Sequence, residues 1–260
     1  MLYNKFHKER IMIQDLHAHT YYSFCSQDKP EKVIETAIAS GIQQLGLSDH
    51  NYGIGCARKE FCWNQGTRLD ADYEKTLVKY YDHMRLLKDK YAKKINLLCG
   101  IEVCTLQNGK DSYALPEKAD VSFFDFCLLE NLDHPTSITN GDLFSFAKRL
   151  GCPVGIAHTD MFAFIQKIGE EPHRYFRKMA EADIFWEMNV NYDSIHGFKV
   201  HDYVTEFFKN KQQQEIVKRS GVKLSVGFDG HIVQEYKPQR VITANKLIKD
   251  MGIRLAFENK

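Results

Sequence analysis

The 260-residue sequence lacks the features that would place it in a membrane or in a disulfide-bonded secretory framework. No stretch reaches the roughly 18 consecutive apolar residues that a membrane span requires. Residues 1–5 do not begin the apolar run of a signal peptide. Seven cysteines without any Cys-x-x-Cys pair indicate neither a disulfide framework nor a zinc ribbon. These absences predict a cytoplasmic protein that does not act at a membrane.

An excess of charge of one sign is also missing. The chain has 35 Lys and Arg against 34 Asp and Glu, a net charge of +1, and so carries no strong nucleic-acid signature. The P-loop pattern is absent, which argues against a nucleoside triphosphatase. No repeat, low-complexity tract or Pro/Gly/Ser linker divides the chain, so we expect one domain over residues 1–260.

What the sequence does contain is an alternation of strand-like and helix-like segments. Helical periodicity is clearest over residues 72–91, and further helices are predicted at 143–150, 201–220 and 241–251. Strands alternating with helices indicate a parallel α/β architecture. The predicted strands are residues 11–16, 43–47, 95–103, 124–129, 153–157, 184–190 and 222–227.

Histidines and carboxylates recur where these strands end. In a parallel α/β barrel the carboxyl ends of all strands meet at one face, which we call the mouth, and active sites lie there. A doubly wound open sheet, the alternative, usually concentrates its site at one switch point. The recurrence therefore favours a barrel with a multinuclear metal site at its mouth. The residues concerned are His17, His19, Asp49, His50, Glu102, His134, His158, Asp229 and His231.

Each of these signals is modest by itself. Strand alternation puts His17 and His19 on one face, although a surface pair has the same pattern. Asp15 is placed to orient a ligand imidazole. Glu102 follows an apolar run, where a carboxylate costs free energy unless it is paired or bound to a metal. His158 alone also fits an ordinary core histidine, so only the whole set of residues indicates a metal site.

The strand-end motifs occur in the order and spacing of the polymerase and histidinol phosphatase (PHP) superfamily. They are DLHAHT at 15–20, GLSDHN at 46–51, GIEV at 100–103, GIAHTD at 155–160 and GFDGH at 227–231. The resemblance extends from residue 13 to residue 257 and is greatest to the histidinol phosphatase branch. It implies a distorted seven-stranded (βα) TIM-like barrel whose trinuclear metal site hydrolyses phosphoesters.

The resemblance also implies a ligand set and a substrate class. The cofactors would be two or three divalent ions of zinc, iron or manganese. The partner would be a small phosphorylated substrate, with histidinol phosphate the first candidate. Phosphodiesters, nucleotides, or a metal-binding domain without catalysis are the alternatives. The first ion would be held by His17, His19, Glu102 and Asp229, the second by Glu102, His158 and a histidine of the fourth strand, and the third by His50, His231 and the residue six positions after His19.

Two positions depart from the family pattern. The residue six positions after His19 is Cys25, where the family has histidine. A thiolate there is a soft ligand that favours zinc or iron over manganese, although a free loop cysteine is equally consistent. At the fourth strand His134 falls two residues late, and Glu130 has the matching alternation and is the alternative ligand.

The remaining predictions concern proton transfer and phosphate binding. Asp229 or Asp49 would assist proton transfer to the leaving group, and Glu102 would bridge two ions. The segment 51–68, with Arg58 and Arg68, would form either a phosphate-binding lid or a solvated loop. Arg174 opens a late helix near the same face. The other histidines are interpreted as solvated or structural: His7, His83, His173, His196 and His201.

Overall fold

A computed structural model describes residues 12–23, 25–52, 54, 73–108, 111–112 and 114–258 of the chain. Seven parallel strands form one sheet, with each strand paired to the next one along the chain. A parallel bridge between Ala18 and Gly230 joins the ends of the first and last strands, so the sheet closes into a barrel. The predicted seven-stranded barrel is therefore confirmed. The strands are β1 (Gln14–Ala18), β2 (Gln44–Leu47), β3 (Asn96–Cys104), β6 (Phe126–Glu130), β7 (Val154–Ile156), β8 (Ile184–Asn189) and β9 (Leu224–Gly227).

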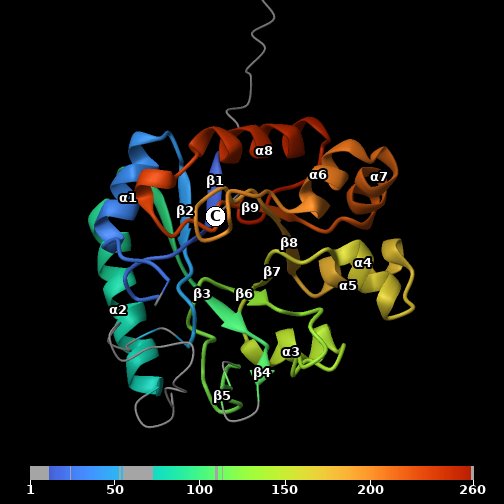
Figure 1. Cartoon of the computed structure of the whole chain (residues 1–260), viewed down its shortest axis with the longest axis horizontal. Helices are drawn as coiled ribbons and strands as arrows, with labels where there is room; N and C mark the ends of the chain where they lie inside the picture. Colours follow the sequence, from blue (N-terminus) through green and yellow to red (C-terminus); the bar gives the residue numbers. More distant parts are fainter. Residues whose placement is uncertain are drawn as a thin grey trace, which may run out of the picture.

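Helices follow the strands and lie around the outside of the barrel (Figure 1). Their ends follow from ordinary capping chemistry: in α3 the Asp142 side chain accepts the Ser145 N–H, and Gly151 at φ 72° ends the helix. None of the described helices is long and apolar enough to cross a membrane. The helices are α1 (Pro30–Ala39), α2 (Tyr73–Tyr91), α3 (Leu143–Leu150), α4 (Met161–Lys167), α5 (Pro172–Glu181), α6 (Asp202–Lys209), α7 (Lys211–Ser220) and α8 (Pro238–Asp250), with the 3₁₀ turn η1 (Val233–Glu235).

Two details differ from the sequence prediction. The helix predicted over 201–220 is two helices, because Asn210 leaves the helical conformation and its side chain accepts the N–H groups of Gln212 and Gln213 to cap α7. After β3 the chain forms an added antiparallel hairpin of β4 (Gln107–Asn108) and β5 (Asp111–Ser112). A two-residue strand carries too little hydrophobic pattern to be predicted.

The barrel has an apolar interior at the amino ends of its strands. Glycines make room for its aromatic rings: a methyl group on Gly46 or Gly100 would collide with the Phe126 ring, and one on Gly155 with Phe185. This plug fills the barrel below the strand ends and leaves the mouth as the place for polar groups. Its members are Leu16, Leu98, Phe126, Leu128, Ala157, Phe185, Ala256 and Phe257.

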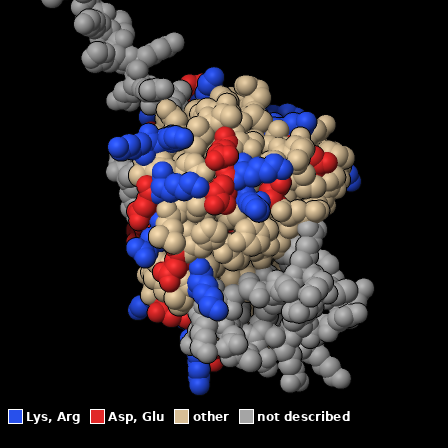
Figure 2. All heavy atoms as spheres, turned by 90° about the vertical axis from the view of Figure 1, so that its left-hand side faces the viewer, with Lys and Arg blue, Asp and Glu red and all other residues tan. Residues whose placement is uncertain are grey.

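The outer surface mixes charges of both signs. Figure 2 shows basic and acidic side chains interspersed on the face that carries α1 and α2. Some of them pair, such as Lys32 Nζ with Asp28 Oδ1 at 2.7 Å and Lys90 Nζ with Glu31 Oε1 at 3.9 Å. Exposed pairs of this kind add little stability, so this face is a mixed solvated surface.

Candidate metal centre

The barrel mouth gathers side chains from the strand ends into one buried group. We call this group the ligand cluster. Within it, donor atoms of His17, His19 and Glu102 lie within 4.8 Å of one another, as do those of three further overlapping sets. The cluster consists of His17, His19, Cys25, His50, Glu102, Glu130, His158, Asp229 and His231.

Glu102 occupies the centre of the ligand cluster. Its Oε1 lies 3.3 Å from His17 Nε2 and 3.1 Å from His158 Nε2, and its Oε2 lies 2.7 Å from His50 Nδ1. Burial alone would raise its pKa, but the surrounding histidines hold the pKa of this carboxyl well below its usual range. A fully buried, ionised carboxylate in contact with three imidazoles has the geometry of a bridging ligand.

Two histidines of the cluster have raised pKa values, whereas burial and the neighbouring His231 and His50 hold the pKa of His19 well below its usual value. Burial would lower the pKa of His158, but its hydrogen bond with Glu102 raises that pKa to about 9. His231 behaves alike: hydrogen bonds with Asp193 and Cys25 outweigh burial and raise its pKa to about 10. The acidic groups around these two histidines thus stabilise positive charge, as expected of a donor set for divalent ions.

Convergent ring nitrogens and an unsatisfied oxygen support the same interpretation. Nε2 of His17 and Nε2 of His19 lie 3.2 Å apart, and His19 Nε2 lies 3.0 Å from Asp229 Oδ1. Among the described residues, Glu130 Oε1 is buried and has no hydrogen-bond partner. A buried carboxylate oxygen left in this way is costly unless a cation binds it. The residues therefore fit a centre of divalent metal ions.

Cys25 joins the cluster from the loop that follows β1. Its donor atom lies within 4.8 Å of those of His19, His50 and His231. Burial raises the pKa of the thiol, but His50 and His231 together bring it below its usual value. A thiolate beside three imidazoles is a donor set typical of zinc.

Two carboxylates behind the cluster orient its histidines. Glu187 Oε1 lies 2.8 Å from His17 Nδ1, its Oε2 accepts the His158 backbone N–H at 2.9 Å, and Asp193 Oδ2 lies 3.3 Å from His231 Nδ1. Such partners fix the tautomer and the direction of a ligand imidazole. The sequence analysis missed both, although a carboxylate inside the apolar strand 184–190 is the signal that singled out Glu102.

Asp15 does not have the predicted role of orienting an imidazole. Its Oδ1 accepts the backbone N–H groups of His17 and Phe228, and its Oδ2 accepts the Tyr236 hydroxyl at 2.8 Å. Asp15 therefore ties β1 to the end of β9.

The backbone at the mouth is shaped for the side chains it carries. His158 and Asp229 have positive φ angles of 27° and 54°, which cost about 1–3 kcal/mol each and cluster at functional sites. The β1–β2 register shifts between Asp15 and Ala18, an irregularity typical of strands beside sites. Gly227 has no side chain, and a methyl group there would collide with Glu187.

Other predicted site residues lie elsewhere. His134 is exposed and its Nδ1 faces Thr136 Oγ1 at 3.0 Å, because Asn131 at φ 61° turns the chain away after β6. The structure thus brings Glu130, and not His134, to the cluster. Asp49 is saturated by four hydrogen bonds from the main chain and hydroxyls of Thr20 and Ser23, so it anchors the β1 loop. This placement does not agree with a role in proton transfer.

The predicted phosphate-binding arginines are separate from the cluster as well. The Arg174 side chain is 67% exposed and its nearest acidic partner is Glu170 at 3.9 Å. It does not line the cavity described next. Arg58 and Arg68, with most of the segment 51–68, lie outside the described residues.

A cavity of about 250 Å³ opens over the ligand cluster. Besides cluster members it is lined by Tyr52, Ile195, His196 and His201. The sequence analysis interpreted both of these histidines as solvated or structural, but the loop between β8 and α6 brings them to the mouth. His196 Nε2 lies 3.3 Å from Asp229 Oδ2 and its Nδ1 lies 2.8 Å from Asp193 Oδ1. The described basic groups of this cavity are all histidines.

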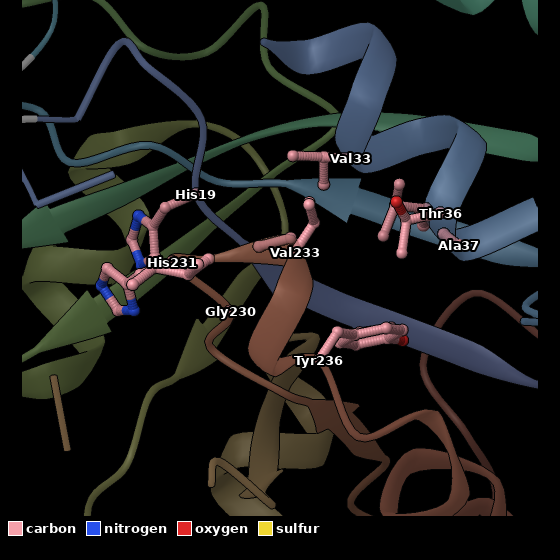
Figure 3. A pocket seen from close by; sticks show the side chains of 12 residues that line it. His19, Val33, Thr36, Ala37, Gly230, His231, Val233 and Tyr236 are labelled. Carbon is pink, nitrogen blue, oxygen red and sulfur yellow. The ribbon is translucent and has the colours of Figure 1, made fainter. Parts of the chain in front are cut away.

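A second and much smaller cavity, of about 30 Å³, lies behind the cluster (Figure 3). His19 and His231 stack there with ring centroids 4.4 Å apart. Val33 and Ala37 of α1 and Val233 of η1 supply apolar walls around them. An apolar surrounding of this kind limits the access of solvent to a metal centre and strengthens its electrostatic interactions.

The closed barrel with histidines and carboxylates at its mouth defines a metal-binding (βα) barrel. The PHP domain model matches residues 15–252, and the chain belongs to this family. No curated protein matches the sequence.

Two solved structures are similar to this chain at low sequence identity. A histidinol phosphate phosphatase from Lactococcus lactis subsp. lactis Il1403, complexed with zinc, L-histidinol and phosphate, is 18% identical with a TM-score of 0.54, over 95% of this chain and 97% of that one. One of the metal-dependent tyrosine phosphatases YwqE from Bacillus subtilis and CpsB from Streptococcus pneumoniae is 15% identical with a TM-score of 0.49, over 92% and 87%.

Proposed function

We propose that this protein is a metal-dependent phosphoesterase that hydrolyses a small phosphomonoester, with histidinol phosphate as the first candidate. The observation that carries the proposal is the buried ligand cluster around Glu102, which opens into a cavity large enough for a small substrate. Membership in the PHP domain family supports it.

We assign the ligands in three groups. His17, His19, Glu102 and Asp229 would hold one ion, and Glu102, Glu130 and His158 a second. Cys25, His50 and His231 would hold a third. When bound, such ions acidify a water molecule and offset the charge that develops on a phosphoryl group. Zinc, iron and manganese all remain candidates.

The chain's own residues would orient the reacting groups. Asp229 presents Oδ1 to His17, His19 and His231, while its Oδ2 faces Asn189 and His196. A carboxylate fixed on both oxygens holds its position without rearrangement, which is what transition-state stabilisation requires. Asp229 lines the cavity, whereas Asp49 does not, and we therefore assign the role in proton transfer to Asp229.

The candidate substrate rests on similarity to a protein bound to L-histidinol and phosphate. The test is phosphate release from histidinol phosphate by protein loaded with zinc, iron or manganese, with and without chelator. A nucleotide phosphodiester and a generic aryl phosphate complete the substrate set. We expect release of phosphate that chelation abolishes and that Glu102→Ala lacks.

The other outcomes separate the alternatives. Hydrolysis of the phosphodiester alone would replace the monoester substrate. Protein that holds ions, gains thermal stability from them and turns over none of the three substrates would be a metal-binding domain without catalysis, and would overturn the proposal.

A further inference from the structure

We propose that the ligand cluster holds two kinds of metal ion, a soft ion such as zinc beside Cys25 and a harder ion such as manganese beside Glu130. The inference rests on the proposed metal centre. It comes from the two positions at which this chain departs from the PHP pattern. Both have side chains in the cluster, in two different donor sets that share His50.

On one side the donor set contains sulfur. Cys25, His50 and His231 have donor atoms within 4.8 Å of one another. The loop that carries Cys25 is fastened to the same place, because the Ser26 hydroxyl donates to the His231 carbonyl at 2.7 Å. A thiolate with two imidazoles suits zinc and disfavours manganese, which prefers oxygen ligands.

On the other side the donor set is rich in oxygen. Glu130 ends β6 with its side chain 91% buried, and its Oε1 lies 3.5 Å from His50 Nδ1 without a hydrogen-bond partner in the described chain. Its carbonyl is held by the N–H and hydroxyl of Thr105, at 3.3 and 2.9 Å. With Glu102 and His158 it offers two carboxylates and one imidazole, a set that manganese or ferrous iron accepts.

The two departures change ligand softness in opposite directions. Histidine is replaced by a softer donor at Cys25 and by a harder one at Glu130. Most sites with mixed donors bind zinc more tightly than manganese. The difference in affinity is smallest at an oxygen-rich site, so manganese is most able to bind there. Each departure also adds a negative charge to a buried centre, which strengthens the binding of divalent cations.

The experiment uses the full chain, stripped with chelator and then given one equivalent of zinc with excess manganese. Elemental analysis after desalting should find zinc and manganese together. Separately, cobalt-loaded protein should show a thiolate-to-cobalt charge-transfer absorption, which does not depend on activity. Cys25→Ser should abolish this band. The matched control is Cys152→Ser, because that thiol lies 3.3 Å from Cys127, ahead of β7 and away from the mouth, and the band should persist.

The carboxylate side has its own variants. Glu130→His should lower retained manganese by at least about tenfold and leave the cobalt band in place. Tenfold is the lower end of the loss seen when a residue hydrogen-bonded to a metal ligand is removed. Cys25→His restores a ligand and keeps the fold testable if Cys25→Ser is unstable; it too should lose the band.

The outcomes are distinct. A charge-transfer band that survives Cys25→Ser, or manganese retention unchanged in Glu130→His, overturns the two-ion inference. Zinc retained after desalting without any manganese also overturns it, while leaving the metal centre in place. Protein that binds none of the three metals contradicts the proposed phosphoesterase itself.

Discussion

The two ends of the barrel are built from the same strands and have opposite chemistry. At the amino ends Phe126 and Phe185 pack against glycine positions in a cluster of apolar side chains. At the carboxyl ends Glu102 and His17 are equally buried but ionisable. The comparison teaches that burial alone does not separate a core from a site; what separates them is whether the buried groups satisfy one another.

The difference is also one of strain. The mouth contains His158 and Asp229 at positive φ, a register shift in β1 and an unsatisfied Glu130 oxygen. Each of these costs folding free energy, and the apolar end must offset it. We therefore expect substitutions at the two ends to separate stability from metal binding.

The largest effect should come from Glu102→Ala and Asp229→Ala. Both should lose metal and activity together. The loss should exceed the 10- to 100-fold that is typical when a residue hydrogen-bonded to a metal ligand is removed, because each substitution removes a proposed ligand itself. The measurement is metal content by elemental analysis beside phosphate release. Circular dichroism is the control for folding. Full activity in either folded variant would contradict the site assignment.

Phe126→Ala tests the opposite end. Removing this fully buried ring from the plug should lower the free energy of unfolding by about 3–5 kcal/mol. Denaturant unfolding of metal-free protein measures the loss. Metal content per folded molecule should stay at the wild-type value, and a parallel loss of metal would show that the two ends are not independent.

Glu187→Gln should have a smaller effect that is confined to the mouth. Glutamine keeps the shape but not the charge that faces His17 Nδ1, so metal affinity should fall about 10- to 100-fold. The matched control is Glu235→Gln, since Glu235 accepts two hydrogen bonds from Ser194 in the neighbouring loop. Competition with a chromogenic chelator measures both; equal losses would indicate a general effect on the mouth loops.

The sequence predicted the strands and most of the ligand cluster because their signals are local. Glu102 is conspicuous after an apolar run, and the alternation of β6 pointed to Glu130. The position of His134 depends on the left-handed conformation of Asn131, and the sequence around Asn131 does not predict that conformation. His196 and His201 line the cavity because of the course of the loop between β8 and α6. The course of a loop depends on contacts with residues distant in the sequence, so it could not be predicted from the local pattern.

The smallest predicted effect is on pH dependence. His158 and His231 have pKa values of about 9 and about 10 in the folded protein, above the usual 6.5. Their contribution to metal-free stability is complete below pH 6.5 and is lost as pH rises through 9 to 10. Metal binds the deprotonated rings, so the gain in Tm from zinc should grow by a few degrees between pH 6.5 and 8.5. Differential scanning fluorimetry at both pH values checks this, and a gain that shrinks would contradict the assigned ligands.

The most direct measurement is a crystal structure of the metal-loaded protein with anomalous diffraction recorded at the edges of zinc, iron and manganese. The account predicts two or three ions at the mouth, with Glu102 touching more than one of them and Cys25, His50 and His231 around another. Ions bound elsewhere with none beside Glu102 would contradict it.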